Sequence, residues 1–491
     1  MKNKKYSLFV AVIVIVILVG VSCSSENYLP ATSTPLPTNE ISFAPSTFPT
    51  STPVSTFTMM PSPTVVTPYP TASAVKANAV AFTSQADGKA SLWVANLDGS
   101  GEKQLVDSFD DTRWNFHGYA ALEWSPNGKW ISYLSSEELW IVSPDGSVNK
   151  KILSFPDKSK GTVYMYQWSP DSSQIAYIQA GPDAGLEGNV PIIVGLLYLE
   201  TGKTLELSSY NSPTPVTFSW SPDGRYLLLS KMSKSAFSIF DITTHEVIKE
   251  IGATGRCSAW HHGVSWSPNS KWFYDIQAGN GRFATTQICV AGLDGLHRQI
   301  DIDGTITSDP VWDKSGNFLY FVVANTDFSI TPLPDYDLRL IRYDVRTQEE
   351  ERLFSLGKEP YSWHVSISPN GSMLELDTYT NTGPVVNLWP PRQYIFMTLD
   401  IQSLSTRKFT VDFGLSELEN FDSSPVWSPD NNNIIFYVNK PYSPNYSPNG
   451  YATYYSFGSF YALDTIIGKT TIVSGVHSVE NAQFSPSFNL P

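Results

Sequence analysis

A five-residue motif recurs along the chain, and this repetition constrains the fold more than any other feature. The motif reads Trp-Ser-Pro-Asn-Gly at residues 124–128 and Trp-Ser-Pro-Asp-Gly at residues 220–224. Self-similarity at a period of about 20–50 residues indicates a repeat architecture. Related copies begin at Trp124, Trp168, Trp220, Trp266, Trp312, Ile367, Trp427 and Phe484.

The motif has the composition of a tight turn. Pro presets φ at the first central position, Asp or Asn suits the second, and Gly takes the left-handed conformation that leads into a hairpin. The aromatic residue ends the preceding strand, and an apolar run follows each of the first seven copies, as at residues 373–376. Many units add a second tight turn, such as Pro144-Asp145-Gly146. Each unit therefore predicts four antiparallel strands, A to D, forming one blade of an all-β propeller.

The motif, the strand that follows it and the later Asp-Gly turn together resemble the TolB-type, WD40-like β-propeller repeat. The resemblance covers about residues 78–491. It implies a propeller fold and suggests protein partners at the cell envelope. Propellers of this kind serve as binding scaffolds, as accessory domains of peptidases and as enzymes, so the resemblance implies the fold more firmly than the function.

The two ends of the repeat region predict that the ring closes on itself. Residues 78–84 resemble a strand B without a motif before it, and the copy at Phe484 is a strand A with little chain after it. Joining the two gives an eight-bladed propeller and leaves no long free sheet edge. A seven-bladed ring would require the unit at Trp312 or Ile367 to form something else.

The N-terminus predicts export. Lys2, Lys4 and Lys5 precede an apolar run from Leu8 to Val21, and Cys23 follows it. A positive flank, a short apolar stretch and small residues indicate a signal peptide over residues 1–22. The position of Cys23 resembles the lipobox of bacterial lipoproteins, which implies lipidation of this residue, although Gly20 stands where that family has Leu. An uncleaved anchor is the alternative, and either would place the rest outside the cytoplasm.

Residues 23–77 are expected to be a disordered spacer. Between Pro30 and Pro70 the chain has 10 Pro and 16 Ser or Thr, with Glu40 as the one charged residue. Such a segment cannot bury enough apolar surface to fold, and Pro biases it toward extended conformations. We expect it to hold the propeller away from the membrane surface.

Charge excludes one class of partner. Lys and Arg number 32 against 46 Asp and Glu, for a net charge of −14, and no basic run follows the first five residues. Phosphate contacts need clustered Lys and Arg, so a nucleic-acid partner is not expected. Hydrophobic residues make up 41% of the 491 residues, which suffices for a substantial core.

Connections B–C and D–A are predicted to lie on one face of the disc, and in this sequence they are long and rich in aromatic residues. Tyr and Trp are favoured at binding sites because they offer a large rigid surface with a polar tip. They would suit a glycan or an extended peptide, or they pack on the rim and fix the loops. The candidate ligand-binding residues on this face are Trp114, His117, His261, His262, His364, Trp389, Arg392, Tyr442, Tyr446 and Tyr451.

Catalytic motifs are not evident. The sequence has no HExxH, no GxSxG and no zinc-type cysteine pairs, and we expect no peptidase domain after the repeats. His261, His262 and His364 could approach the central channel and form a metal site resembling those of propeller lyases, or they are satisfied polar residues at the channel mouth. We therefore expect no catalytic residues, no metal and no cofactor. A metal-dependent lyase or hydrolase is the alternative.

The remaining cysteines predict a disulfide. Cys257 precedes strand A of the fifth unit and Cys289 lies in its strand C, and export permits oxidation. Two buried free thiols are the alternative. The sequence thus predicts a monomeric cell-surface lipoprotein whose propeller binds an envelope protein or a glycan.

Overall fold

The computed structural model describes eighteen segments of the repeat region. They are residues 79–86, 89–109, 122–157, 161–181, 190–212, 216–231, 236–252, 261–277, 287–325, 337–357, 364–381, 392–411, 420–421, 425–441, 445–446, 452–453, 456–474 and 479–484. All of them belong to the compact unit Met59–Pro491. Within these segments, no helix has the length and apolar character required to cross a membrane.

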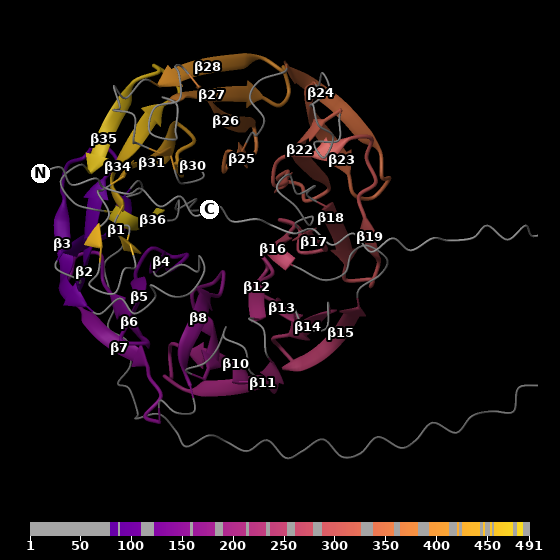
Figure 1. The fold of residues 1–491 in the computed structure, drawn as a ribbon. Coiled ribbons are helices and arrows are strands. Elements are labelled where there is room, and N and C mark those ends of the chain that lie inside the picture. Colours follow the sequence, from indigo (N-terminus) through magenta and orange to yellow (C-terminus); the bar gives the residue numbers. More distant parts are fainter. Residues whose placement is uncertain are drawn as a thin grey trace, which may run out of the picture. The chain divides into compact units, whose positions relative to one another are not determined.

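Eight sheets of four or five antiparallel strands stand side by side in a ring (Figure 1). Blade 1 contains β36 (Val479–Phe484), β1 (Ala79–Ala86), β2 (Lys89–Asn96) and β3 (Lys103–Phe109), and blade 2 contains β4 (Leu122–Trp124), β5 (Ile131–Ser135), β6 (Glu138–Val142) and β7 (Asn149–Leu153). Blade 3 contains β8 (Thr162–Trp168), β9 (Gln174–Ala180), β10 (Val190–Tyr198) and β11 (Thr204–Ser212), and blade 4 contains β12 (Val216–Trp220), β13 (Tyr226–Lys231), β14 (Ala236–Asp241) and β15 (Glu246–Gly252).

The second half of the ring follows the same order. Blade 5 contains β16 (His261–Trp266), β17 (Trp272–Gln277), β18 (Gln287–Gly292) and β19 (His297–Gln299), and blade 6 contains β20 (Thr305–Ile306), β21 (Val311–Trp312), β22 (Phe318–Ala324), β23 (Leu338–Asp344) and β24 (Glu350–Gly357). Blade 7 contains β25 (His364–Ile367), β26 (Met373–Asn381), β27 (Arg392–Asp400) and β28 (Thr406–Val411), and blade 8 contains β29 (Asn420–Phe421), β30 (Val426–Trp427), β31 (Asn433–Pro441), β34 (Ser456–Asp464) and β35 (Thr470–Ser474).

The predicted closure of the ring is confirmed. β36 from the C-terminal end pairs with β1 from the N-terminal end, with Val80 opposite Phe484 and Phe82 opposite Ala482. The units at Trp312 and Ile367 both form blades, so the ring has eight blades rather than seven. The inner strand of each blade ends at the first residue of a motif, as the sequence predicted.

The second residue of the motif closes the A–B turn. In blade 2, Ser125 Oγ accepts a hydrogen bond from the Trp130 backbone N–H at 2.9 Å and donates one to Asn127 Oδ1 at 2.9 Å. Asn127 Oδ1 also accepts from the Lys129 N–H at 3.0 Å. In blade 6, Asp313 replaces the serine and accepts from the Phe318 N–H. The same three bonds recur around Ser169, Ser221, Ser267, Ser368 and Ser428.

The fifth position of the motif adopts positive φ even where it is not glycine. In three blades, Ser or Asn takes the left-handed conformation that the sequence assigned to Gly. Each of these side chains accepts a hydrogen bond from the turn of the preceding blade, which compensates the backbone strain. The acceptors are Ser172 from the Asn127 N–H at 2.9 Å, Ser270 from the Asp223 N–H at 3.1 Å and Asn431 from the Asn370 N–H at 2.8 Å.

The aromatic residue of the motif connects neighbouring blades. Its indole N–H donates to the preceding blade, where the acceptor is the carbonyl of the residue just before that blade's own Trp. These bonds join Trp220 to Gln167, Trp266 to Ser219 and Trp312 to Ser265. In blade 3, Trp168 Nε1 instead donates to Ser132 Oγ at 2.8 Å.

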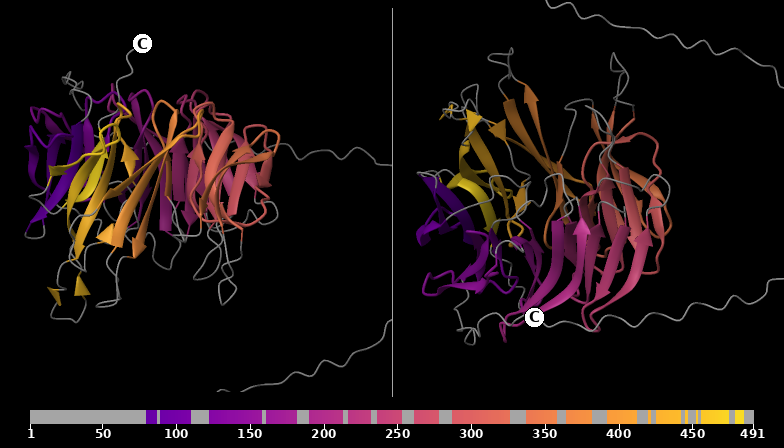
Figure 2. Two further views of the ribbon diagram at one scale, coloured as in Figure 1. Left: turned by 90° about the horizontal axis from the view of Figure 1, so that it is seen from above. Right: turned by 60° about the horizontal axis from the view of Figure 1, so that its bottom comes forward.

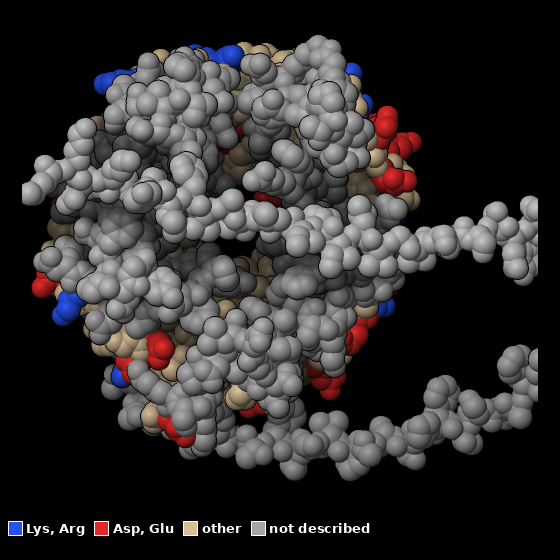
Figure 3. Space-filling model, in the orientation of Figure 1, with Lys and Arg blue, Asp and Glu red and all other residues tan. Residues whose placement is uncertain are grey.

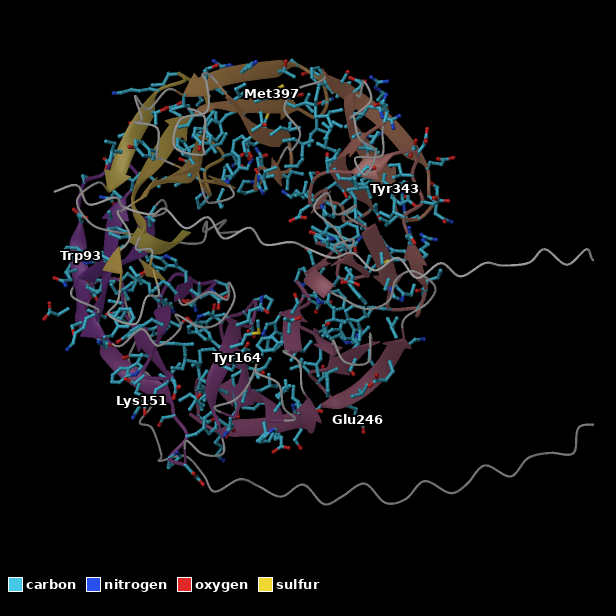
Figure 4. The ribbon with its side chains drawn as sticks, viewed as in Figure 1. Trp93, Lys151, Tyr164, Glu246, Tyr343 and Met397 are labelled. Carbon is cyan, nitrogen blue, oxygen red and sulfur yellow. The ribbon has the colours of Figure 1, made fainter. Side chains whose placement is uncertain are left out.

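The hydrophobic core is divided among the junctions between blades. One cluster of buried residues fills each junction. Met397 on β27 and Tyr343 on β23, both buried, belong to the junctions of blade 6 with blade 7 and with blade 5, respectively (Figure 4). Because every blade packs on two neighbours, neither face of a sheet is left uncovered.

Glu123 lies between two blades, where burial disfavours the charged form of its carboxyl group. It precedes Trp124 on β4, is partly buried, and accepts a hydrogen bond from the Trp168 backbone N–H. Gln167 holds the same position in blade 3 and accepts from the Trp220 N–H through Oε1 at 3.2 Å. Burial raises the pKa of Glu123 to about 8, and the bond from Trp168 opposes this only in part.

Glu123→Gln should therefore stabilise the protein at alkaline pH. The pKa of Glu123 in the folded state lies above its unfolded value of about 4.3, so its contribution to stability is present below about pH 4 and is lost as pH rises toward 8. Gln keeps the acceptor for Trp168 and does not ionise. We expect a gain on the order of 1–3 kcal/mol near pH 9 and none near pH 4, measured by thermal melts across pH.

Gln167→Glu is the matched control, because it places a carboxyl group at the equivalent position of blade 3. Its melting temperature should fall as pH rises from 4 to 9. A Glu123→Gln difference that is constant over this range would contradict the cause given for the shift in the pKa of Glu123.

Candidate functional site

The two faces of the ring differ in how their connections are built. In an antiparallel A–B–C–D blade the A–B and C–D turns lie at one end and the B–C and D–A connections at the other. The A–B connections have nearly constant length. Strand A ends at Trp124 and strand B begins at Ile131 in blade 2, and the corresponding residues in blade 8 are Trp427 and Asn433. The B–C connections range from Ser135–Glu138 to Pro441–Ser456. We call the end with the B–C and D–A connections the loop face.

The longest of these connections carries its own hairpin. β32 (Asn445–Tyr446) pairs with β33 (Ala452–Thr453), and the pair stands away from the ring on one side of the disc (Figure 2). Where the described residues are visible in Figure 3, Lys and Arg side chains lie around the rim of the ring, with Asp and Glu side chains between them.

Only part of the predicted ligand-binding set falls on described residues. Tyr446 lies in β32, Arg392 begins β27, and His261 and His262 begin β16, but the side chains of these four lie outside the described part. His364 begins β25, and its side chain is described. Outside the described residues are Trp114, His117, Trp389, Tyr442 and Tyr451.

His364 belongs to a cluster on the two inner strands of blade 7. In the pairing of β25 with β26, His364 lies opposite Asp377 and Ser366 lies opposite Glu375. Alternation along a strand places these four side chains on one side of the sheet. Leu374 and the other residues of the opposite side pack against blade 6. The cluster therefore faces blade 8.

The polar atoms of the cluster are close to one another. His364 Nδ1 lies 3.0 Å from Asp377 Oδ1 and 4.0 Å from Glu375 Oε2. Ser366 Oγ donates to Glu375 Oε2 at 2.8 Å. The ligand atoms of His364, Glu375 and Asp377 all lie within 4.8 Å of one another, and among the described residues no other three His, Cys, Asp or Glu side chains do so.

Exposure decreases from one end of the cluster to the other. The side chain of His364 is 29% exposed, that of Asp377 10% and that of Glu375 0%. His364 is the first residue of β25, directly after a D–A connection, so the open end of the cluster points to the loop face. Glu375 Oε1, at the closed end, has no hydrogen-bond partner among the described residues.

Burial shifts the protonation of both carboxyl groups. It raises the pKa of Glu375 well above its ordinary value, and the neighbouring Asp377 raises it further, while the bond from Ser366 acts in the opposite direction. Burial also raises the pKa of Asp377, although His364 opposes this shift by hydrogen bond and charge. Burial thus disfavours the charged form of both carboxyl groups.

Glu375 occupies a position that the fold does not reserve for a charge. The residue pairs with the one just before the motif and faces the next blade. A carboxyl group here departs from the apolar or hydroxyl pattern, which marks the position as a functional candidate. The other blades fill the position with Ala81, Ser132, Ala176, Leu228, Tyr274, Tyr320 and Ile435.

Sequence reasoning singled out His364 but missed Glu375 and Asp377. It treated residues 373–376 as an apolar run, and Glu375 within that run was the available signal. The three side chains offer one imidazole nitrogen and up to four carboxylate oxygens. Such a set can hold a cation or retain protons.

Cys289 is disulfide-bonded. It lies in β18, the third strand of blade 5, and its side chain is fully buried. The partner sulfur lies outside the described residues, as does Cys257. The pairing of Cys257 with Cys289 therefore stays a prediction.

No family model matches the chain. A stretch of 145 residues is 26% identical to a protein of Aspergillus clavatus described as a probable dipeptidyl-peptidase 5, and the match covers 26% of this chain and 20% of that protein. The chain thus spans about a fifth of that relative's length.

Similar solved structures include enzymes as well as TolB. Dipeptidyl peptidase 4 of Porphyromonas gingivalis has a TM-score of 0.49 at 11% identity, covering 74% of this chain and 54% of that chain. An oligogalacturonate lyase of Vibrio parahaemolyticus has a TM-score of 0.41 at 13% identity, covering 76% and 88%. A protein described as TolB from Agrobacterium tumefaciens has a TM-score of 0.32 at 20% identity, covering 59% and 95%.

Reduction of the disulfide should lower the stability of blade 5. Closing the loop between Cys257 and Cys289 is expected to contribute about 2–4 kcal/mol. Peptide mapping without reductant should recover residues 257 and 289 in one linked peptide, and Cys257→Ser should lower the melting temperature as much as reductant does. Recovery of Cys289 linked to Cys23 would contradict the pairing.

Proposed function

We propose that the protein is an exported, lipid-anchored propeller that binds a protein or a glycan on its loop face and does not catalyse a reaction. The observation that carries this proposal is the difference between the two faces. Turns at one face are held by buried serines and by bonds between blades, so their shape has little freedom. Connections at the loop face vary widely in length, which is typical of a rigid scaffold with one working side.

The residues of the loop face suit recognition of an uncharged or extended ligand. Trp389 belongs to the B–C connection of blade 7, Tyr442 and Tyr451 belong to the longest connection, and Tyr446 lies in the β32–β33 hairpin between the two tyrosines. Aromatic side chains provide large contact area at small entropic cost, and their polar tips supply hydrogen bonds. A sugar ring or a peptide backbone presents the complementary apolar face and polar edge.

The N-terminal region supports a location outside the cytoplasm, anchored to the outward-facing surface of a membrane. An acylated Cys23 supplies the anchor, and the Pro-rich stretch from Pro30 to Pro70 supplies distance from the membrane. The propeller then reaches partners beyond the lipid surface. The resemblance to TolB-type repeats favours an envelope protein among these partners.

A metal-dependent lyase or hydrolase is the second candidate, because His364 lies beside two buried carboxyl groups. Burial of the same groups argues against it. Glu375 has no exposed side-chain surface, and Asp377 is 10% exposed. A group that acts on a substrate must reach the reacting atoms within hydrogen-bond distance. A polymer bound on the loop face would meet His364 alone, so we favour binding without chemistry.

Substitution of the hairpin tyrosines should abolish ligand binding. The full chain with Cys23→Ser is screened on a glycan array and by cross-linking to solubilised envelope proteins. We expect Tyr442→Ala, Tyr446→Ala and Tyr451→Ala together to weaken binding at least about tenfold, because buried aromatic anchors commonly contribute 2 kcal/mol or more.

The control uses the same blade and the opposite face. Ile466, Ile467 and Ile472 are exposed by 59%, 70% and 53% and lie at the C–D turn and in β35 of blade 8. Their replacement by Ala should leave binding unchanged. Loss of binding in this variant, with the tyrosine variant unaffected, would refute the loop face as the ligand site.

Cys23→Ala should release the protein from the membrane. Without the sulfur no lipid can be attached to residue 23, so the proposed lipid anchor is lost. Fractionation of cells should find the variant in the soluble extracytoplasmic fraction, and mass spectrometry of the wild type should find a diacylglycerol group on Cys23. A variant that stays in the membrane with residues 6–22 still attached would contradict the lipoprotein assignment.

A further inference from the structure

We propose that His364, Glu375 and Asp377 form a binding site for one divalent transition-metal ion, of the Mn²⁺ or Zn²⁺ class, in blade 7 at its junction with blade 8. This inference does not depend on the proposed ligand of the loop face. It stands on the geometry of the donor atoms, on a buried oxygen that has no hydrogen-bond partner among the described residues, and on the place of the cluster in the ring.

The distances between donors fit a single ion. Two ligands at about 2.1 Å from a metal lie about 3.0 Å apart when they are at right angles and about 4.2 Å apart when they are opposite. His364 Nδ1 lies 3.0 Å from Asp377 Oδ1 and 4.0 Å from Glu375 Oε2, and all donors lie within 4.8 Å. Small side-chain rotations therefore suffice to place three ligands around one ion.

A buried oxygen supplies the second, independent observation. Glu375 is fully buried, and its Oε1 has no hydrogen-bond partner among the described residues. A buried polar oxygen normally has a hydrogen-bond partner or binds a metal ion. Ser366 Oγ holds the other oxygen, Oε2, at 2.8 Å and so fixes the orientation of the carboxyl group, which is the role of residues that support a metal ligand.

The chemistry of the donor set defines the class of ion. Two carboxylates, a neutral imidazole and a divalent cation sum to zero charge, which suits a crevice of low dielectric. One nitrogen and a few oxygens favour Mn²⁺ or Zn²⁺, whereas Ca²⁺ prefers six to eight oxygen ligands. The partly exposed His364 gives the ion access from the loop face.

The site also lies where the row of Trp-mediated bonds between inner strands is interrupted among the described residues. The motif of blade 7 begins with Ile367, which has no indole N–H to donate to blade 6. In blade 8, the buried Trp427 Nε1 has no hydrogen-bond partner among the described residues. Among the described residues, Trp-mediated bonds of the kind seen at blades 3 to 6 are thus not found on either side of blade 7. An ion bound by residues of both β25 and β26 would stabilise β25, the inner strand of blade 7.

The experiment measures metal binding by the full chain carrying Cys23→Ser, after treatment with chelator. Mn²⁺ is titrated alone by equilibrium dialysis and by electron paramagnetic resonance, and Zn²⁺ is titrated by calorimetry. We expect one ion per chain, and a melting temperature that rises with metal concentration, because an ion bound only by the folded state stabilises it.

Single substitutions test the ligands. Glu375→Gln, Asp377→Asn and His364→Gln should each weaken binding at least about tenfold and remove the metal-dependent rise in melting temperature. Glu123→Gln is the matched control, because it replaces a partly buried carboxyl group on the inner strand of blade 2, and it should bind as the wild type does. Where a buried substitution prevents folding, His364→Gln decides, since this side chain is partly exposed.

Three results would overturn the proposal. They are the absence of stoichiometric binding of Mn²⁺ or Zn²⁺, binding that all three ligand variants retain, and binding of Ca²⁺ alone. Each leaves the loop-face function untouched, because the tyrosine variants test that function with a different readout.

Discussion

The fold depends on the hydrogen bonds that a buried serine makes at six A–B turns, with Asp313 in its place in blade 6. Its hydroxyl accepts the N–H of the first residues of strand B and donates to the Asp or Asn of the motif, so the turn holds its shape without solvent, as around Ser125 and Ser221. A fixed turn sets the register of strands A and B, and that register decides which side chains meet the next blade. These side chains form the junctions between blades, and the junctions together form the ring. Variation is left to the connections at the other end, which is why the binding function is placed there.

Ring closure depends on the pairing of a strand from the C-terminal end of the repeat region with a strand from its N-terminal end. β36 completes the sheet of β1, β2 and β3, so the chain needs no cap for a free edge. At the turn face, side chains at the fifth motif position reach back to the preceding blade, and at the inner strands the indole groups of Trp220, Trp266 and Trp312 do the same. These bonds all run in one direction around the ring; the indole bonds are interrupted at Ile367, whereas Asn431 still joins blade 8 to blade 7.

Much of this architecture could be predicted from the sequence, because the motif marks the end of each inner strand and fixes the count of blades. The sequence could not predict that Ser172, Ser270 and Asn431 adopt a left-handed conformation, because the hydrogen bond that compensates the strain comes from a neighbouring blade. Division of the inner strand of blade 6 into β20 and β21 also has no sequence signal that we recognise. The inward position of Glu375 could have been predicted, because the hairpin that follows the motif pairs this residue with Ser366. The pattern of apolar residues alone assigned residues 373–376 to an apolar strand.

Glu375 is a residue that the propeller fold does not require. A carboxyl group at a position filled elsewhere by Leu228 or Ile435 costs stability through desolvation, and nothing in the ring architecture calls for it. Neighbouring residues are arranged around it nonetheless: Ser366 orients one oxygen, and Asp377 and His364 continue the polar row toward the loop face. Four polar side chains in register across two strands are hard to explain as tolerated defects, since each would be independently unfavourable. A shared ligand gives all four one reason to be there.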